Sequence, residues 1–332
     1  MVAAVETMAY GRGIPWHALG TKTENPLSTA EEMLEASGLL WDVVKTPMTT
    51  RFGGADVIVP NTWANVRQSD GSVLGVVGDA YQILQNRAAF AFADNLVDSG
   101  AAKYETAGSL FGGRRVFLSM EIPEGVKVPG DEGSVKPYIL VTNSHDGSSP
   151  VIGAVVMVRV VCNNTLTAAL AGAKRTFRVR HTGSLEGKIA AAREALGVTF
   201  TYIDTFSEIA GRLAMTKVTE KQIDKILEAA FPIPETQKNP DRIEQSDFWK
   251  VRDLYRETEN LDPIRGTAWG LLQAVGEYVD HVQDFHGRRF ADVDVRMDSI
   301  VYDGPAAIRK QKVLDLLSPL AKVPVASRAK AR

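Results

Sequence analysis

The sequence predicts an α+β protein, with an antiparallel sheet in the N-terminal half and helices in the C-terminal half. Up to about residue 162, short apolar or alternating runs are separated by glycine-containing turns, a pattern typical of strands and hairpins. Beyond that point, apolar residues recur at three- and four-residue spacing over longer segments, as in amphipathic helices. Because strands and helices are segregated along the chain, the pattern favours α+β over a parallel βαβ arrangement.

The first expected helix begins at a cap within Ser28-Thr29-Ala30-Glu31 and ends at Gly38, since hydroxyl side chains are good N-caps and glycine is a good terminator. Strands are then expected at 41–45, 55–59, 63–67 and 72–77, with Asp70-Gly71 as a hairpin turn. A helix is predicted from Asn86 to Gly100. Two further hairpins are predicted, 104–110 with 114–122 and 138–142 with 151–161.

The rest of the chain reads as helical. Helices are expected at 165–173, 185–213, 220–231, 248–259, 267–285 and 306–317. These assignments divide the chain into a sheet domain over 1–183, a helical region over 184–320 and a basic, disordered tail over 321–332.

Composition narrows the class of protein. The chain has 332 residues, of which 45% are hydrophobic and 23% charged, and its net charge is -2. A nucleic-acid site would therefore be a local basic patch rather than a general property of the surface. The single cysteine, the lack of a signal-peptide pattern and the lack of a long apolar run predict a cytoplasmic protein without a membrane segment.

The densest group of polar residues lies around the third predicted hairpin. We call it the polar cluster, and its members are Asn143, His145, Asp146, Arg159, Asn163, Asn164 and His181. Pairing of the two strands would bring most of these residues together. Their ordinary structural role is also evident, since Asn143 and Asp146 are turn formers and Asn163 or Asn164 suits the N-cap of a helix starting near Thr165.

Two chemical uses of this region stay open. His145, Asp146, Cys162 and His181 are possible metal ligands, and Cys162 with either histidine could form a nucleophilic pair. The spacing matches no structural zinc pattern, however, and Cys162 ends a strongly apolar run, which is typical of an inert core cysteine. We therefore assign no catalytic residue, metal or cofactor, and whether the protein is an enzyme stays undecided.

Positive charge gives the sharper functional signal. Basic residues expected to bind nucleic acid are Lys174, Arg175, Arg178, Arg180 and Lys188, joined by Arg114 and Arg115 at a predicted hairpin tip. Phe177 and Val179 alternate with two of the arginines, as in a strand with one basic face that could follow phosphates. Bases could stack on Tyr104, Phe111 or Phe177. The alternative is a solvated face whose charges pair with acidic helices.

No phosphate-binding loop accompanies this basic segment. The sequence has no Walker lysine motif, and Gly11 and Gly13 lack both a preceding strand and the third glycine of a dinucleotide fingerprint. ATP-driven activity is therefore not expected.

Several segments resemble a known family. They are Ile14–Gly20, Tyr81–Asn86, Leu140–Gly147, Arg159–Leu166 and His181-Thr182. In this order they are similar to the phage/plasmid-like proteins grouped as a domain of unknown function. The resemblance implies a gene of phages, plasmids and their hosts, acting in the bacterial cytoplasm, and it supplies no catalytic residues. The chain also has a remote similarity to single-strand annealing proteins, which combine an antiparallel sheet with helices and a basic groove. This similarity rests on analogy between folds.

Together these features predict an ATP-independent protein that binds single-stranded DNA and promotes annealing during recombination, as a homo-oligomer and away from membranes. Two alternatives remain. One is a metal-dependent or Cys/His hydrolase, and the other is a phage accessory protein that binds a host protein.

Overall fold

The structure is a computed structural model that describes residues 5–11, 20–24, 26–159, 164–166, 176–182, 198–233, 235, 243–283 and 305–324. The chain forms two compact units that interleave along the sequence. Unit 1 comprises Met1–Pro123, Tyr138–Ala154 and Thr176–Gly197, and unit 2 comprises Glu124–Pro137, Val155–Arg175 and Val198–Arg332. Each is described by itself.

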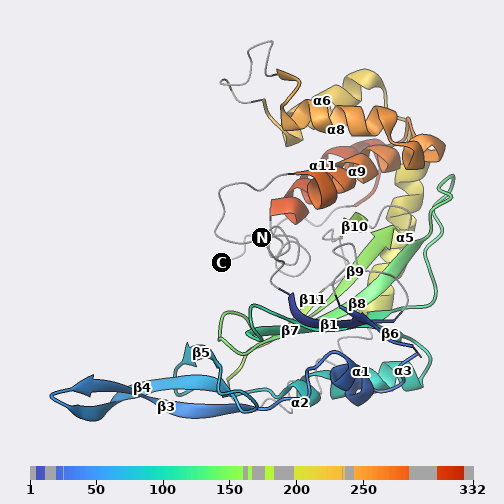
Figure 1. The fold of residues 1–332 in the computed structure, drawn as a ribbon. Coiled ribbons are helices and arrows are strands. Elements are labelled where there is room, and N and C mark those ends of the chain that lie inside the picture. Colours follow the sequence, from blue (N-terminus) through green and yellow to red (C-terminus); the bar gives the residue numbers. More distant parts are fainter. Residues whose placement is uncertain are drawn as a thin grey trace. The chain divides into compact units, whose positions relative to one another are not determined.

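The larger sheet, sheet A, has the strand order β10-β9-β8-β7-β6-β1-β2, with β11 also paired to β9 (Figure 1). Its strands are β1 Val5–Tyr10, β2 Thr21–Lys22, β6 Lys103–Leu110, β7 Arg115–Glu121, β8 Val135–Ser144, β9 Val151–Arg159, β10 Asn164–Leu166 and β11 Thr176–Val179. Among the pairings with a defined register, only β1 with β2 is parallel. Consecutive hairpins therefore build most of the sheet.

Three short helices lie in the described part of unit 1. They are α1 Ala30–Ala36, α2 Asn86–Phe90 and α3 Asp94–Asp98, with a 3-10 turn at Ala91–Ala93. Helices α1 and α3 contact β6, and α2 contacts α1. Thr29 and Glu32 form a capping box that starts α1. One carboxylate ties these elements together, because Asp94 Oδ1 accepts from the Ala30 amide at 2.5 Å and from the Tyr104 hydroxyl at 2.6 Å.

A second sheet, sheet B, joins β3 Val43–Phe52, β4 Ala55–Arg67 and β5 Val73–Val77 in that order. The predicted strands 55–59 and 63–67 are one strand, whose pairing with β3 shifts register after Pro47. Gly75 lies against the turn between β8 and β9, since a Cβ there would stand 2.4 Å from Asp146 Cα. Only glycine permits so close an approach of two backbones.

Two other local predictions are corrected. The helix expected from Asn86 to Gly100 is divided into α2, the 3-10 turn and α3. The helix expected from Thr165 begins instead as a strand, because Asn164, Thr165 and Leu166 pair with the end of β9. Pairing with a sheet edge outweighs the local capping signal of Asn164, and residues 167–173 lie outside the described part of the chain.

Unit 2 is mainly helical. Its helices are α5 Val198–Met215, α6 Glu220–Ala230, α8 Asp247–Glu257, α9 Ala268–Glu277 and α11 Pro305–Ala321, with a 3-10 turn η3 Glu259–Ile264 and a π-helical turn η4 Tyr278–Val282. Helix α9 is buried on all sides, and Trp269 at its start is fully buried, with its indole N–H donating to Asp131 at 2.7 Å. A buried ion pair, Lys310 Nζ to Asp280 at 2.8 Å, links α11 to η4.

The α+β prediction is confirmed, with a strand-rich first half and a mostly helical region over residues 200–321. The predicted domain boundary at 183 falls outside the described residues, so that division stays a prediction. Among the described helices, none is long and apolar enough to cross a membrane.

Gly153 provides a test of how β11 is held on β9. The two strands place Phe177 directly opposite Gly153, and a Cβ at this glycine would lie 1.9 Å from the phenylalanine ring. We expect Gly153→Ala to destabilise the protein by about 1–3 kcal/mol because the ring must leave its position. Urea denaturation measures the loss. In the double variant with Phe177→Ala the cost should fall below the sum of the single costs, and strict additivity would contradict the contact.

Candidate functional site

The end of β8 is hydrogen-bonded to the segment of residues 81–86, whose last residue, Asn86, is the first residue of α2. The Tyr81 hydroxyl donates to the Ser144 carbonyl at 2.7 Å, and the side-chain amide of Asn143 donates to the Leu84 carbonyl at 2.9 Å. Asn143 and Ser144 are completely buried. A buried asparagine is stable only when its polar atoms find partners, so this segment fixes the end of β8.

His145, at the first position after β8, is fixed in one tautomer. Asn86 donates its amide N–H to the Leu39 carbonyl, which orients its oxygen toward His145 Nε2 at 2.9 Å. The ring nitrogen facing that oxygen must therefore carry the proton, and Nδ1 keeps its lone pair. Asn65 of β4 donates to the His145 carbonyl at 2.7 Å, which ties sheet B to the same residue.

Burial keeps this imidazole neutral. Removal from water lowers the pKa of His145 from 6.5 to about 3, and repulsion from the nearby His181 contributes. The pKa of His181 is lowered for the same main reason, desolvation. The two histidines singled out in the sequence therefore lie near one another, and both favour the uncharged form.

His181 is held by Tyr81 and Gln82. Its ring stacks on Tyr81 with the centroids 4.7 Å apart, and Nδ1 faces the Gln82 carbonyl at 3.2 Å. The Gln82 amide donates back to the His181 carbonyl at 2.7 Å. Because a carbonyl only accepts, Nδ1 carries the proton and Nε2 presents a lone pair.

Four buried acceptor atoms around the end of β8 lack a hydrogen-bond partner among the described residues. They are Asn65 Oδ1, Asn143 Oδ1, His145 Nδ1 and His181 Nε2. Each of these atoms can accept a hydrogen bond from a donor such as a buried water. Within the described part of the chain, no group of three or more His, Cys, Asp or Glu side chains could hold a metal ion. Cys162 and Asn163 lie outside that part, so the hydrolase alternative stays a prediction.

Asp146 has a structural contact of its own. Its carboxylate accepts from the Ser148 amide at 2.9 Å and so closes the turn between β8 and β9. Arg159 and Asn164 face each other where β9 pairs with β10, and only their backbones are described. The structure thus brings Asn143, His145 and His181 together, with Asp146 beside them in the turn.

A buried arginine, which the sequence analysis missed, supports this site. Arg67 ends β4 and donates to both carboxylate oxygens of Glu6 at 2.8 and 2.9 Å and to the Gly112 carbonyl at 2.9 Å. Its guanidinium also lies over the Trp41 ring, 4.6 Å from the centroid. The Arg67 hydrogen bonds lower the pKa of Glu6, which is consistent with an ionised pair. The position looked like an ordinary strand end in the sequence.

Four of the predicted basic residues gather at one end of sheet A, which we call the basic end: Arg114, Arg115, Arg178 and Arg180. Arg115 pairs with Ser144 at the end of β8, and Val151 at the start of β9 pairs with Val179 at the end of β11. Since a six-residue turn joins β8 to β9, these four positions lie at the same end of the sheet. Arg115 Nε reaches Ser148 Oγ in that turn at 3.4 Å.

Three of the four side chains of the basic end are exposed, and Arg115 is half-buried. Arg114, Arg178 and Arg180 are exposed, and no carboxylate of the described residues pairs with them. Arg115 lies over the ring of Phe111, 5.3 Å from its centroid. Asp146 is the one acidic residue in the β8–β9 turn. The basic end therefore carries a local excess of positive charge.

The remaining residues predicted to contact nucleic acid are either outside the described part of the chain or partly to fully buried. Lys174, Arg175 and Lys188 lie outside the described residues. Tyr104 is buried and bonded to Asp94, so it is not available for base stacking. Phe111 at the β6–β7 turn and Phe177 on β11 are both half-buried.

The comparisons with known proteins place the chain in a family. Residues 73–312 match the family DUF932, described as a domain of unknown function. The chain belongs to the DUF932 family. Neither the comparison with curated proteins nor the comparison with solved structures finds a match.

The DUF932 match contains most of the site. Segment 81–86, the arginines of the basic end and the polar cluster all fall within residues 73–312. Asn65 and Arg67, like the rest of β3 and β4, precede the matched region. The part of sheet B that buries the β8–β9 turn is therefore contributed partly from outside the family match.

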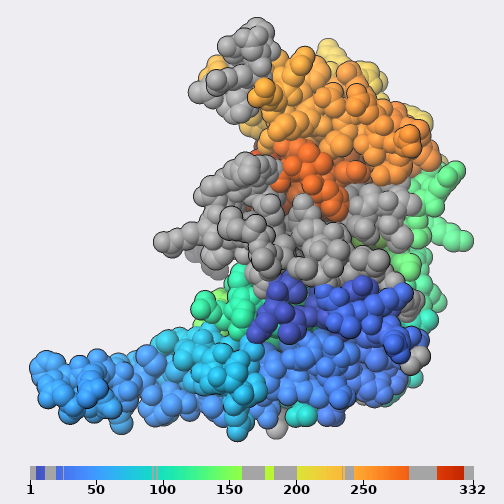
Figure 2. Space-filling view, viewed as in Figure 1, coloured from blue at the N-terminus to red at the C-terminus, as the bar shows by residue number. Residues whose placement is uncertain are grey.

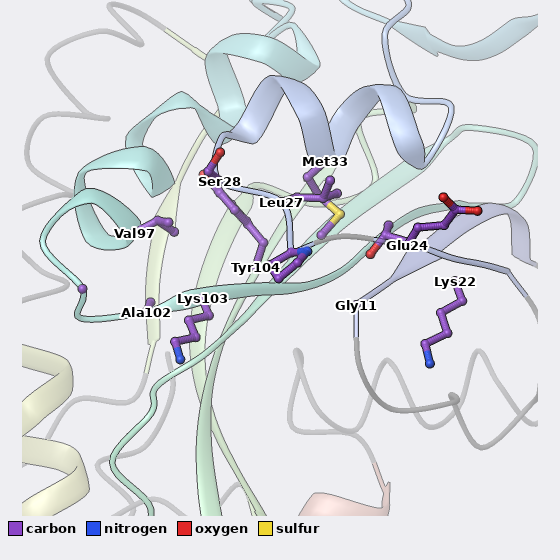
Figure 3. Close-up of a pocket in the computed structure, with 13 residues that line it drawn as sticks. Gly11, Lys22, Glu24, Leu27, Ser28, Met33, Val97, Ala102, Lys103 and Tyr104 are labelled. Atoms are coloured by element: carbon purple, nitrogen blue, oxygen red, sulfur yellow. The ribbon is translucent and has the colours of Figure 1, made fainter.

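This DUF932 protein also has a cavity of about 610 Å³ in unit 1, apart from the polar cluster. Leu27, Met33 and Tyr104 form part of its apolar wall, and the amines of Lys22 and Lys103 point away from α1 (Figure 3). No residue of the polar cluster or of the basic end lines the cavity. It is a separate feature of the unit.

The lowered pKa of His145 gives a pH-dependent stability. Between pH 6.5 and about 3 the unfolded chain binds a proton at this residue and the folded chain does not. Stability should therefore fall with falling pH in that window, by about 1.4 kcal/mol per pH unit from this residue. Urea denaturation of the wild type and of His145→Gln, which keeps a donor for Asn86 but does not titrate, measures the difference. A difference between the two proteins that is constant with pH would contradict the assignment.

Proposed function

We propose that this DUF932 protein binds single-stranded DNA through the basic end of sheet A and promotes annealing of complementary strands without nucleotide hydrolysis. One observation carries the proposal. Two pairs of arginines, at 114–115 and 178–180, are far apart in sequence and lie at the same end of one sheet. A cluster of guanidinium groups on a rigid support suits the phosphates of a polynucleotide backbone.

The support beneath the arginines favours a preformed site. Arg115 follows a tight turn whose Arg114 carbonyl accepts from the His145 amide at 2.7 Å. β11, which carries Arg178, is paired along its whole length with β9. These contacts hold the backbone before a ligand arrives, which lowers the entropic cost of binding.

Contacts of this kind would not read bases. Arginines at turns and strand ends bind phosphates from outside, whereas base readout needs side chains aimed at base edges. Annealing requires binding that tolerates any sequence, so phosphate contact with limited stacking fits the proposed role. The resemblance to phage and plasmid proteins suggests that the setting is recombination in a host cytoplasm.

Salt dependence of binding tests the basic end directly. Replacing Arg178 and Arg180 by alanine should weaken binding to a single-stranded oligonucleotide and reduce the salt slope by about 1.4, since each lost phosphate contact contributes about 0.7. Fluorescence anisotropy over a range of salt concentrations measures both quantities. Charge reversal, Arg178→Glu with Arg180→Glu, should abolish binding at low salt.

The matched control lies on α6 of unit 2. Lys221 and Lys225 are exposed, so Lys221→Glu with Lys225→Glu changes the net charge as much as the arginine reversal does. This control should bind almost as well as the wild type. Absence of binding by the wild type at low salt, or equal losses in both reversed variants, would contradict a specific basic end.

Annealing is measured separately from binding. Two complementary oligonucleotides labelled with a fluorescence donor and acceptor should pair faster with the protein than without it, in buffer free of ATP. The Arg178→Ala, Arg180→Ala variant should lose most of this acceleration because it no longer concentrates the strands. Binding without acceleration would leave a single-strand binding protein and would refute the annealing role.

A further inference from the structure

The β3–β4 hairpin projects from unit 1 as a narrow arm (Figures 1 and 2). Past Thr49 and Ile58 the arm has only two strands, and nearly all its side chains are exposed. A two-stranded ribbon has little stability of its own in water. Its persistence as an apolar, exposed element points to a partner that covers it.

One face of the arm continues the outer face of sheet B. Side chains alternate along a strand, and directly paired residues share a face. The register thus places one set of residues together, which we call the outer stripe: Val44, Thr46, Met48, Thr50, Phe52, Ala55, Val57, Ala64, Val66, Val73 and Val76. The stripe has no ionisable side chain. Ile58, Arg51 and Asp56 lie on the opposite face.

The outer stripe exposes large apolar groups at both ends. Phe52 and Val57 at the distal end are 81% and 47% exposed, and Val73 and Val76 at the proximal end are 57% and 53% exposed. Val44 beside them is 39% exposed. Between the two ends lie the uncharged β3 side chains of Thr46, Met48 and Thr50. Isolated apolar residues on a surface are ordinary, but several exposed apolar groups on one uncharged face mark an interaction site.

Charge and size indicate what covers it. A nucleic acid or a strongly charged protein finds no complementary charge on the stripe. A second copy of the chain brings an identical uncharged stripe, so no like charges repel. At about 100 Å² for each of the five exposed side chains, complete burial in two copies would amount to about 1,000 Å², which is the lower limit for a specific interface.

We propose that the outer stripe is the interface of a two-fold symmetric dimer, in which two arms stack face to face and antiparallel. The distal Phe52 and Val57 of one copy then cover the proximal valines of the other, and both exposed ends are buried at once. Such an interface is isologous and closes on itself. The inference concerns a different surface from the basic end and does not depend on DNA binding.

Analytical ultracentrifugation of the full chain without DNA, over a range of concentrations, tests the dimer. The wild type should show a monomer–dimer equilibrium. Phe52→Thr with Val57→Thr places β-branched residues at both positions of the exposed arm and should raise the dimer dissociation constant by at least about thirtyfold, as expected for loss of an aromatic anchor.

Ile58→Thr is the matched control, because Ile58 is 64% exposed on the opposite face of the same ribbon. It should leave the dissociation constant unchanged. A wild type that stays monomeric, or an Ile58→Thr effect as large as that of the stripe variant, overturns the proposal. Circular dichroism of each variant confirms that the fold is kept.

Disulfide trapping tests the antiparallel arrangement. A mixture of Phe52→Cys and Val76→Cys proteins should form a mixed dimer on mild oxidation, because distal and proximal ends meet. A mixture of Ile58→Cys and Val76→Cys proteins should not. Native Cys162 is present in both mixtures and cannot cause a difference. Equal yields of mixed dimer, or none in the first mixture, overturn the arrangement.

Discussion

The hydrogen bonds at the end of β8 are the constraint on which the site depends. Asn143, Ser144 and His145 are completely buried, and buried polar groups cost stability unless they are paired. Their partners come from the 81–86 segment and from β4. The position of the β8–β9 turn therefore depends on sheet B and on the 81–86 segment. The positions of the arginines beside the turn depend on the same contacts.

The histidines fit this structural role more closely than a catalytic one. Each donates one ring N–H to a fixed acceptor, and burial keeps each ring neutral. A general base at neutral pH needs a pKa near the working pH, and the pKa of His145 is far below it. His145 thus acts as a neutral connector between β8 and α2, and His181 joins the end of β11 to Gln82.

The sequence predicted the hairpins of sheet A well, because glycine turns and alternating residues are local signals. It failed where distant pairing decides the outcome. Asn164 is a residue type that favours a helix N-cap, yet it begins strand β10 and pairs with the end of β9. Arg67 resembles any strand-end arginine, and only the fold brings Glu6 to it. The polar cluster was visible as composition, but its partners Asn65, Leu84 and Asn86 come from segments without a motif.

The outer stripe and the β8–β9 turn lie against opposite faces of sheet B, and the basic end of sheet A lies beside that turn. The inner face, with Asn65 and Gly75, packs on the β8–β9 turn beside the basic end. The outer stripe is the reverse face, since Val66 and Val76 alternate with those inner residues. A partner bound to the stripe therefore leaves the β8–β9 turn, and the arginines of the basic end beside it, uncovered. Because the outer stripe is uncharged and the proposed phosphate-binding arginines lie beyond the other face of sheet B, self-association through the stripe would bring two copies of the basic end into one particle without blocking either.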